Sequence, residues 1–328
     1  MTAKKMNSLQ AVNSALAQAM AEDDKVLVLG EDVADREGGG VTGATAGLST
    51  RFGDDRVKST PISEQAIIGA AIGAALAGYK PVAEIMLMNF TTVAMDMIFN
   101  HAAKLRFMSG GQSTVPITIR TLTGAGWQTA GQHADHLEGW FAHTAGIKVV
   151  APSTPADYKG LLLSCIQDPD PCIFIESAGS LFIPGEVDEV ATPIPLGKAR
   201  IVQEGSDITI VSWSSQLLRC QAALSALAEA GISVELVDLR TVSPWDREAV
   251  LASVAKTGRA LVVHEAVRDF GPGGEIASTI AEELFGQLKA PVRRLGAPKS
   301  PVPFAKVLED AYIVSPERVA DAVKALMA

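Results

Sequence analysis

The chain has 328 residues, 48% of them hydrophobic, and a formal net charge of −9, and this length allows two domains that each have their own core. The acidic balance and the lack of clustered Lys and Arg exclude a nucleic-acid-binding protein, because neutralising phosphates needs clustered positive charge. No apolar run reaches the roughly 20 residues that cross a bilayer, so we predict no membrane-spanning segment.

The first residues, MTAKKMNSLQAV, lack the apolar stretch that a signal peptide needs. Cys165, Cys172 and Cys220 show no metal-binding spacing, and each lies in an apolar stretch. We therefore predict a cytoplasmic protein with three reduced and buried thiols.

In the first half of the chain, short β-rich runs alternate with helical patterns. Continuous apolar strands that alternate with helices are typical of a parallel sheet covered on both faces. The predicted strands are 25–30, 81–87, 115–120, 147–152 and 172–177, and the predicted helices are 7–21, 63–78, 90–108 and 154–167.

Residues 178–200 contain three prolines and three glycines without a sustained period, and we predict that they link two domains. The alternation of strands and helices restarts after them. We therefore expect an α/β fold of two doubly wound domains, at 1–190 and 191–328. In the second domain the predicted strands are 207–213, 232–239, 259–265 and 291–296, and the predicted helices are 215–230, 246–256, 273–286 and 316–327.

The stretch STPISEQAIIGAAIGAALAG, residues 59–78, places Glu64 at the start of an apolar helix that contains no Lys or Arg. Ser63 is a good N-cap, and the helix dipole stabilises an anion in the first turn, so Glu64 has a structural explanation. Ligands also bind where strands end and helices begin, and a carboxyl in an apolar cleft gains a raised pKa that suits proton exchange with a ligand nitrogen. The pattern alone leaves both explanations open. Gly69, Gly73 and nearby alanines form a small-residue face that favours tight packing against another subunit.

Three of the five histidines, His133, His136 and His143, fall within AGQHADHLEGWFAH. His133 ends a loop rich in Gly and Thr that follows a predicted strand, which makes it the best acid–base candidate of the three. His136 is a weaker candidate, and His143 has the helical setting of a structural residue. A metal site here is disfavoured because no further ligand is placed to complete it.

Phosphate-binding motifs are absent from the sequence. No GxGxxG follows the first strand, and no Walker loop exists. The GPGGE of 271–275 lacks the required spacing and is better explained as a turn and helix cap. A phosphorylated cofactor would therefore need another chain to hold its phosphates.

Several blocks of the sequence together resemble one family. The blocks are GEDV (30–33), TPISE (60–64), KPVAEIMLMNF (80–90), NHAAKLRFMSGG (100–111), GQHADHLEGWFAHTAGIKVVAPSTPADYKGLLLSCIQDPDP (131–171) and VDLRTVSPWD (237–246). In this order they resemble the β subunit of thiamine-diphosphate-dependent 2-oxoacid dehydrogenases, whose relatives act on pyruvate, branched-chain oxoacids or acetoin. The resemblance implies a pyrimidine-binding, transketolase-like domain followed by a transketolase C-terminal domain.

The same resemblance implies partners. It implies an α2β2 heterotetramer in which the α subunit supplies the Mg²⁺ and diphosphate site and a second β subunit is contacted. A lipoyl acyltransferase core is a further expected partner. This arrangement would explain why the chain lacks a phosphate loop.

The resemblance also assigns roles to residues of the first domain. Glu64 matches the glutamate that hydrogen-bonds the aminopyrimidine ring nitrogen of thiamine diphosphate, and Glu31 would join an acidic relay towards it. His133 matches the active-site histidine that helps the reaction with substrate and the acyl transfer to lipoamide. The apolar residues expected around the aminopyrimidine ring are Ile62, Met86 and Phe90.

The family's β subunit often holds a structural potassium ion through main-chain carbonyl oxygens, so the resemblance implies K⁺ here too. This assignment rests on the resemblance alone. The corresponding positions are Ile117, Cys165, Ile166, Asp168 and Asp170.

Two segments depart from the family pattern. The family usually has HSQS or HSDS, whereas this chain has Ala134 and His136 in place of the two serines. A longer polar or basic run that ends in Leu-Tyr is replaced by SAGSLF at 177–182. Both segments lie towards the substrate side, so the sequence leaves the substrate open, with Gly-Ala-Gly at 124–126 leaning towards the acetoin and pyruvate members.

The sequence therefore predicts the β subunit of a 2-oxoacid or acetoin dehydrogenase that cleaves the C–C bond next to a carbonyl and passes the acyl group to lipoamide. Two alternatives stay open: a carboligase-type thiamine-diphosphate enzyme without a lipoyl partner, and a non-catalytic assembly or regulatory subunit on the same fold. A nicotinamide-dependent oxidoreductase fits the α/β alternation but lacks the glycine fingerprint.

Overall fold

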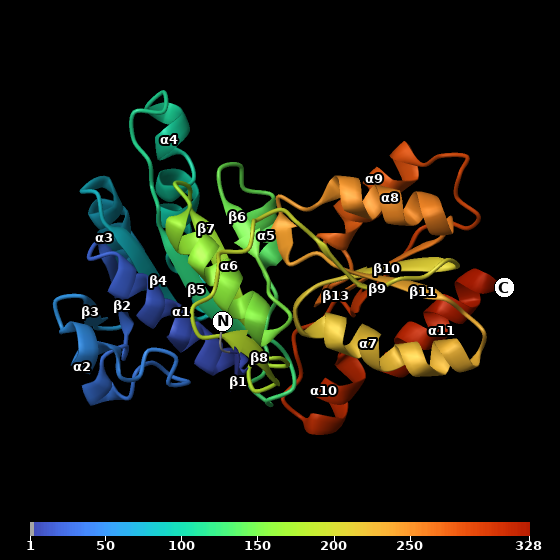
Figure 1. The fold of residues 1–328 in the computed structure, drawn as a ribbon, viewed down its shortest axis with the longest axis horizontal. Helices are drawn as coiled ribbons and strands as arrows, with labels where there is room; N and C mark the ends of the chain where they lie inside the picture. The colour runs from blue at the N-terminus through green and yellow to red at the C-terminus, as the bar shows by residue number, and fades with distance from the viewer. Residues whose placement is uncertain (1–2) are drawn as a thin grey trace.

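The structure is a computed structural model that describes residues 3–328. Two α/β domains lie side by side along the long axis of the molecule, and each is built around its own sheet (Figure 1). The predicted fold class is confirmed. Within the described part of the chain, no helix is both long enough and apolar enough to span a membrane.

The first domain contains a seven-stranded sheet with the order β12-β6-β7-β5-β4-β2-β3. Its central pairs are all parallel, as predicted, and only β12 at one edge runs antiparallel to its neighbour. One predicted strand begins late: residue 116 is a proline without a backbone N–H, and β5 starts two residues after it. The strands are β2 (Val26–Glu31), β3 (Val57–Thr60), β4 (Lys80–Leu87), β5 (Thr118–Thr123), β6 (Lys148–Val150), β7 (Cys172–Ser177) and β12 (Thr241–Ser243).

Successive residues of a strand point to opposite faces of the sheet. Both faces of this sheet are apolar, and helices cover both of them. Val28 and Val82 face one core, which includes residues of α1 and α6. Leu29 and Ala83 face the other core, which includes residues of α3. The helical elements are α1 (Ser8–Glu22), η1 (Asp35–Glu37), α2 (Leu48–Phe52), α3 (Glu64–Leu76), η2 (Met88–Thr92), η3 (Met97–Ala102), α4 (Leu105–Met108), α5 (Glu138–Ala142) and α6 (Pro155–Gln167).

The helix predicted over 90–108 is wrong as a single element, because the structure divides it into η2, η3 and α4. Thr91 donates its hydroxyl to the Met88 carbonyl at 2.5 Å, and Thr92 donates to the Asn89 carbonyl at 2.7 Å. Such side-chain bonds to nearby backbone compete with regular α-helical hydrogen bonding, which accounts for the 3₁₀ start.

The second domain contains a five-stranded sheet with the order β14-β13-β10-β11-β9, parallel except for β9 at one edge. One core lies against α7 and α11, and the core on the other side is continuous with that of the first domain. The strands are β9 (Arg200–Gln203), β10 (Ile208–Ser212), β11 (Val234–Asp238), β13 (Ala260–Val267) and β14 (Arg293–Ala297). The helices are α7 (Ser214–Glu229), α8 (Arg247–Thr257), α9 (Gly273–Glu283), α10 (Lys306–Tyr312) and α11 (Pro316–Met327).

The segment predicted to be an irregular linker is partly regular. Its strand β8 (Pro184–Asp188) pairs antiparallel with β1 (Ala3–Asn7) at the other end of the domain sequence. Strand β12 also crosses the predicted boundary, because it follows residue 191 in sequence yet completes the sheet of the first domain. The division at 190/191 therefore stays a prediction.

The three cysteines are buried and free, as predicted. Burial raises the pKa of the Cys220 thiol to about 12 and that of the Cys165 thiol well above its ordinary range. Both thiols are therefore unreactive at neutral pH.

Candidate active site

The candidate site lies where parallel strands of the first sheet end. Strand β2 ends at Glu31, β4 ends just after Met86, and β5 ends at Thr123, before a loop over 124–137. Because these strands are parallel neighbours, their carboxyl ends meet at one edge of the sheet. Glu64 joins them as the first residue of α3, directly after β3 and a short turn.

Glu64 is a nearly buried carboxylate without a cation. Its residue surface is only 9% exposed, and no hydrogen bond or ion pair joins its carboxylate to another residue within 3–328. Ser63 occupies the N-cap position, but its hydroxyl donates to the Pro61 carbonyl at 2.9 Å instead of accepting from the helix. The predicted side-chain cap is therefore wrong, while the predicted helix start at Glu64 is correct.

Glu31 lies beside Glu64 and is likewise nearly buried, with 8% of its surface exposed. Burial raises the pKa of Glu31, and the Glu64 carboxylate raises it further, against a hydrogen bond from the Ser63 backbone N–H. The two neighbouring carboxylates repel each other, which disfavours the ionised form of Glu31. The structure thus brings together the two acids that the sequence singled out.

The apolar residues predicted around these acids differ in exposure. Met86 and Phe90 are half-buried, whereas Ile62 is 81% exposed at the surface of the chain. The Phe90 ring meets the His133 ring edge to face, with ring centroids 5.5 Å apart and planes at 74°. The His133 ring therefore packs against the apolar ring of Phe90.

His133 belongs to a loop that is held by Asn89, a residue that the sequence reasoning missed. The Asn89 amide donates to the Asp135 carboxylate at 2.8 Å and to the Gly131 carbonyl at 3.1 Å, and it accepts from the Asp135 backbone N–H at 3.2 Å. The same loop has left-handed backbone at Gln128 and Ala130, with φ of 56° and 63°. Non-glycine residues rarely adopt this conformation, so the surrounding contacts must hold the loop.

A second missed feature is a buried ion triad beneath the site. Arg120 on β5 donates to Glu84 on β4 and to Glu176 on β7, both at 2.7 Å. Burial raises the pKa of Glu176, as does Glu84, while Arg120 lowers it. The sequence shows Glu84, Arg120 and Glu176 as charged residues inside apolar strands. It does not show that these three strands are neighbours, so the ion triad could not be predicted.

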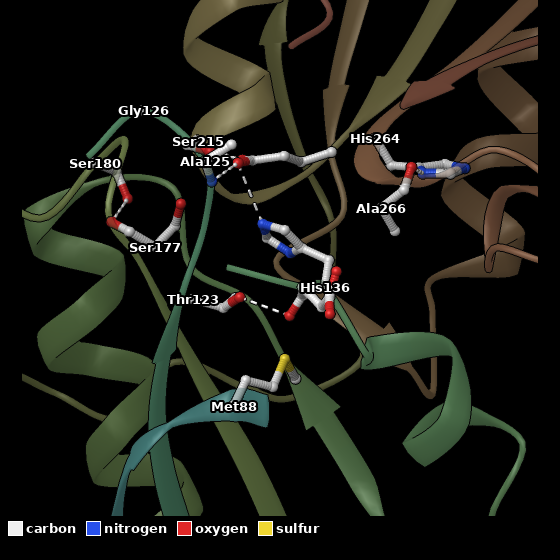
Figure 2. Close-up of polar contacts among 12 residues, drawn as sticks. Met88, Thr123, Ala125, Gly126, His136, Ser177, Ser180, Ser215, His264 and Ala266 are labelled. Atoms are coloured by element: carbon white, nitrogen blue, oxygen red, sulfur yellow. Dashed lines mark hydrogen bonds and ion pairs between the residues drawn. The ribbon is translucent and has the colours of Figure 1, made fainter. Parts of the chain in front are cut away.

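The other histidines have different settings. His136 is buried between two carboxylates, with its ring pointing towards Ser215 and Ala125 (Figure 2). His143 is exposed at the C-terminal end of α5. His264 stacks on Trp213 with ring centroids 5.4 Å apart, and burial lowers its pKa to about 4. Across residues 3–328, no three His, Cys, Asp or Glu side chains converge as a metal site would require.

The positions expected to hold potassium lie at the C-terminal end of α6 and the starts of β5 and β7. Lys148 donates to Asp168 at 2.5 Å and to Asp170 at 3.2 Å, and Arg106 donates to Asp170 at 2.5 Å. These cations neutralise both carboxylates, so a potassium ion here would bind main-chain carbonyl oxygens. The carbonyls of Ile117 and Cys165 each accept one backbone N–H, from Cys172 and Asp168 respectively, and keep a second lone pair for a cation. Ile166 is buried in the same turn of helix.

Comparisons with known proteins agree in both domains. Residues 4–182 match the transketolase pyrimidine binding domain, and residues 197–319 match the transketolase C-terminal domain. A solved split gene transketolase, described as an inactive β4 tetramer, superposes with a TM-score of 0.80 over 98% of both chains. Its 20% sequence identity supports the fold alone.

Curated relatives are more similar in sequence. The chain is 44% identical to the acetoin:2,6-dichlorophenolindophenol oxidoreductase subunit beta of Cupriavidus necator, over 99% of this chain and 98% of that protein. It is 43% identical to the pyruvate dehydrogenase E1 component subunit beta of Acholeplasma laidlawii, over 97% of both chains. It is 45% identical to the mitochondrial 2-oxoisovalerate dehydrogenase subunit beta of Dictyostelium discoideum, over 94% of this chain and 83% of that protein.

Proposed function

Because this chain belongs to the family of β subunits of acetoin and 2-oxoacid dehydrogenases, built from transketolase pyrimidine-binding and C-terminal domains, we propose that it is the β subunit of an α2β2 enzyme. This enzyme uses thiamine diphosphate to cleave the C–C bond next to the carbonyl of a small 2-oxoacid or of acetoin. It passes the acyl group to lipoamide on an acyltransferase core.

The observation that carries this proposal is the unpaired carboxylate of Glu64 beside Glu31. A nearly buried acid without a cation is costly unless it shares a proton or receives a hydrogen bond. An aminopyrimidine ring nitrogen fits this requirement, because it can share a proton with a carboxyl group. The residues present therefore fit the ring end of thiamine diphosphate.

When bound, thiamine diphosphate supplies the nucleophile and the electron sink for the carbon chemistry. Glu64 would hydrogen-bond the ring nitrogen through its carboxyl group and exchange a proton with it, and Glu31, whose pKa is raised by burial and by Glu64, would be the second acid of the relay. Met86 and Phe90, which are half-buried, would pack against the ring, and Ile62, which is 81% exposed in this chain, would join them once the α subunit covers it.

His133 is the acid–base group on the substrate side. Its ring lies over Phe90, on the loop that follows β5. From there it can donate a hydrogen bond to a carbonyl oxygen or hold a proton for acyl transfer.

The proposed partner is an α subunit that supplies Mg²⁺ and the diphosphate site. Three observations support it: the chain has no phosphate loop, Ile62 is largely exposed, and the small-residue face of α3 is open to solvent at Ala70 and Gly73. A second β subunit completes the tetramer. We also propose K⁺ at the carbonyls near Cys165 and the cytoplasm as the location, where buried thiols stay reduced.

Co-expression tests the proposal. The full chain alone should show no turnover, and the complex with a family α subunit, Mg²⁺ and thiamine diphosphate should reduce 2,6-dichlorophenolindophenol. Pyruvate, acetoin, 2-oxobutyrate and branched oxoacids form the substrate panel. A complex that binds thiamine diphosphate but turns over none of them would overturn the proposal and favour a non-catalytic assembly subunit; product formation without an electron acceptor would favour a carboligase.

A further inference from the structure

The loop over 124–137, which carries His133, lies between the two domains and is held from both sides. On the side of the first domain, Asn89 holds Asp135 by the bonds described above. Thr123 at the end of β5 donates its hydroxyl to the Asp135 carbonyl at 2.6 Å (Figure 2). These contacts fix one half of the loop to the sheet that forms the candidate site.

The next residue, His136, ties the loop to the second domain. Its side chain is 5% exposed, and its Nε2 lies 3.3 Å from Oε1 of Glu265 on β13. Its Nδ1 lies 3.4 Å from Oε2 of Glu138, at the start of α5. Glu265 is itself fixed, because the backbone N–H of Ala125 donates to it at 3.0 Å and the Ser215 hydroxyl also donates to it.

A second buried acid of the other domain holds the first half of the loop. Glu309 on α10 is completely buried. It accepts hydrogen bonds from the backbone N–H of Gly126 at 2.7 Å and of Gln128 at 3.1 Å. The strained backbone at Gln128 is thus held by a carboxylate of the second domain.

The ring of His136 lies between two carboxylates at ion-pair distance, 3.3 Å from Glu265 and 3.4 Å from Glu138, and its Nε2 has no hydrogen-bond partner within the described residues. Two negative charges this close favour the positively charged form of the imidazole. Burial alone would lower the pKa of His136, but Glu265 and Glu138 outweigh it and raise the pKa to about 10. The other charged or titratable groups that face this cluster are Tyr158, Arg219, His264 and Tyr312.

We propose that His136 is a positioning residue, which with Glu265 and Glu309 of the second domain holds the loop that carries His133 in its working geometry. The second domain thereby acts on the site through the loop that carries His133. This inference concerns the loop of this chain, and its catalytic consequence rests on the proposed function.

Hydrogen–deuterium exchange of the full chain tests the positioning role without any turnover. In His136→Gln, amides within 124–137 should exchange about tenfold faster than in the wild-type chain at labelling times that are short compared with global unfolding, over which the amides of both sheets stay unexchanged. Glu265→Gln should give the same local change and leaves one carboxylate for one imidazolium, so it tests the proposal even where His136→Gln fails to fold.

Asp157→Asn is the matched control. Asp157 on α6 is buried and pairs with Arg200 at 3.2 Å and Arg240 at 2.8 Å, so this variant also weakens a charged contact between the domains. It touches no residue of the loop, and exchange within 124–137 should stay unchanged. In the complex with the α subunit, His136→Gln should lower kcat about 10²-fold with KM unchanged, because displacing a catalytic group by about 1 Å has that effect.

Unchanged exchange of the loop in both variants would overturn the positioning role, as would a uniform increase over the whole chain. Exchange is measured on the chain itself, whereas the proposed function is tested by turnover of the wild-type complex. The two proposals can therefore fail separately.

Discussion

Two buried acidic clusters of this protein have opposite electrostatics. At the edge of the first sheet, Glu31 and Glu64 lie side by side, and no cation of the described chain pairs with Glu64. At the domain interface, Glu138 and Glu265 lie on either side of His136, which pairs with both. Burial and two carboxylates occur in both clusters, and only the positive charge differs.

The difference separates a binding site from a structural contact. A buried carboxylate that forms an ion pair within the chain contributes to the stability of the fold, because removing either partner leaves the other charge buried and uncompensated. A buried carboxylate that is left unpaired costs free energy in the free chain, and a ligand that brings a proton can recover this cost. We infer that Glu64 is kept for a ligand and Glu265 for the structure.

The largest expected difference between the clusters is in stability. Glu265→Gln should lower the free energy of unfolding by about 3–5 kcal/mol, because it breaks a buried ion pair. Glu64→Gln should change it by no more than about 0.5 kcal/mol, since no partner is lost and one like-charge repulsion is removed. Urea denaturation of the full chains measures both. Equal losses in the two variants would show that the clusters do not differ in kind.

The stability lost in Glu265→Gln should depend on pH. His136 has a pKa raised from 6.5 to about 10, so its contribution is complete below pH 6.5 and is lost as the pH rises towards 10. Glu265 has a pKa lowered from 4.5 to about 2, so its contribution is complete above pH 4.5 and is lost as the pH falls towards 2. The difference from wild type should therefore be largest between pH 4.5 and 6.5. A difference that grows above pH 8 would contradict the charged His136.

A smaller effect, on assembly, is expected from a substitution on the exposed side of α3. Ala70→Arg should leave the chain folded, because Ala70 is exposed, but should prevent assembly with the α subunit. Light scattering after gel filtration measures the assembly. Ala222→Arg, at an exposed alanine of α7 in the second domain, is the control and should still assemble. Normal assembly of Ala70→Arg would show that the small-residue face is not part of the interface with the α subunit.

The smallest effect is expected from potassium. In K⁺ the full chain should melt about 2–4 °C higher than in Na⁺ at equal ionic strength, because a bound ion stabilises the folded state by mass action. Scanning calorimetry measures the shift. Identical melting in both salts would contradict a K⁺ site at the carbonyls of Ile117 and Cys165.

The sequence correctly predicted the features that depend on local sequence patterns. Apolar runs located the central strands of both sheets, and the helix start at Glu64 was correct because a turn with Pro61 precedes it. The family resemblance, carried by blocks along nearly the whole chain, is confirmed. The neighbourhood of Glu31 and Glu64 was expected from the family resemblance alone, because β3, which pairs with β2 and precedes Glu64, was not among the predicted strands.

The sequence did not predict the features that depend on contacts between residues far apart in the chain. Strand β8 was hidden because its partner β1 lies at the start of the chain. His136 was read as a weak acid–base candidate because its partner Glu265 belongs to the other domain. The side chain of Ser63 was expected to cap α3, but the nearer Pro61 carbonyl accepts its hydroxyl.

The most direct test of the account is turnover of Glu64→Gln in the complete enzyme with the α subunit and saturating thiamine diphosphate. Glutamine keeps the shape of the side chain but cannot hold the proton at the ring nitrogen. We expect turnover to fall about 10²–10⁴-fold while the complex still assembles; Glu22→Gln, at an exposed acid of α1, should retain full activity. Unchanged turnover of Glu64→Gln would contradict the role proposed for Glu64.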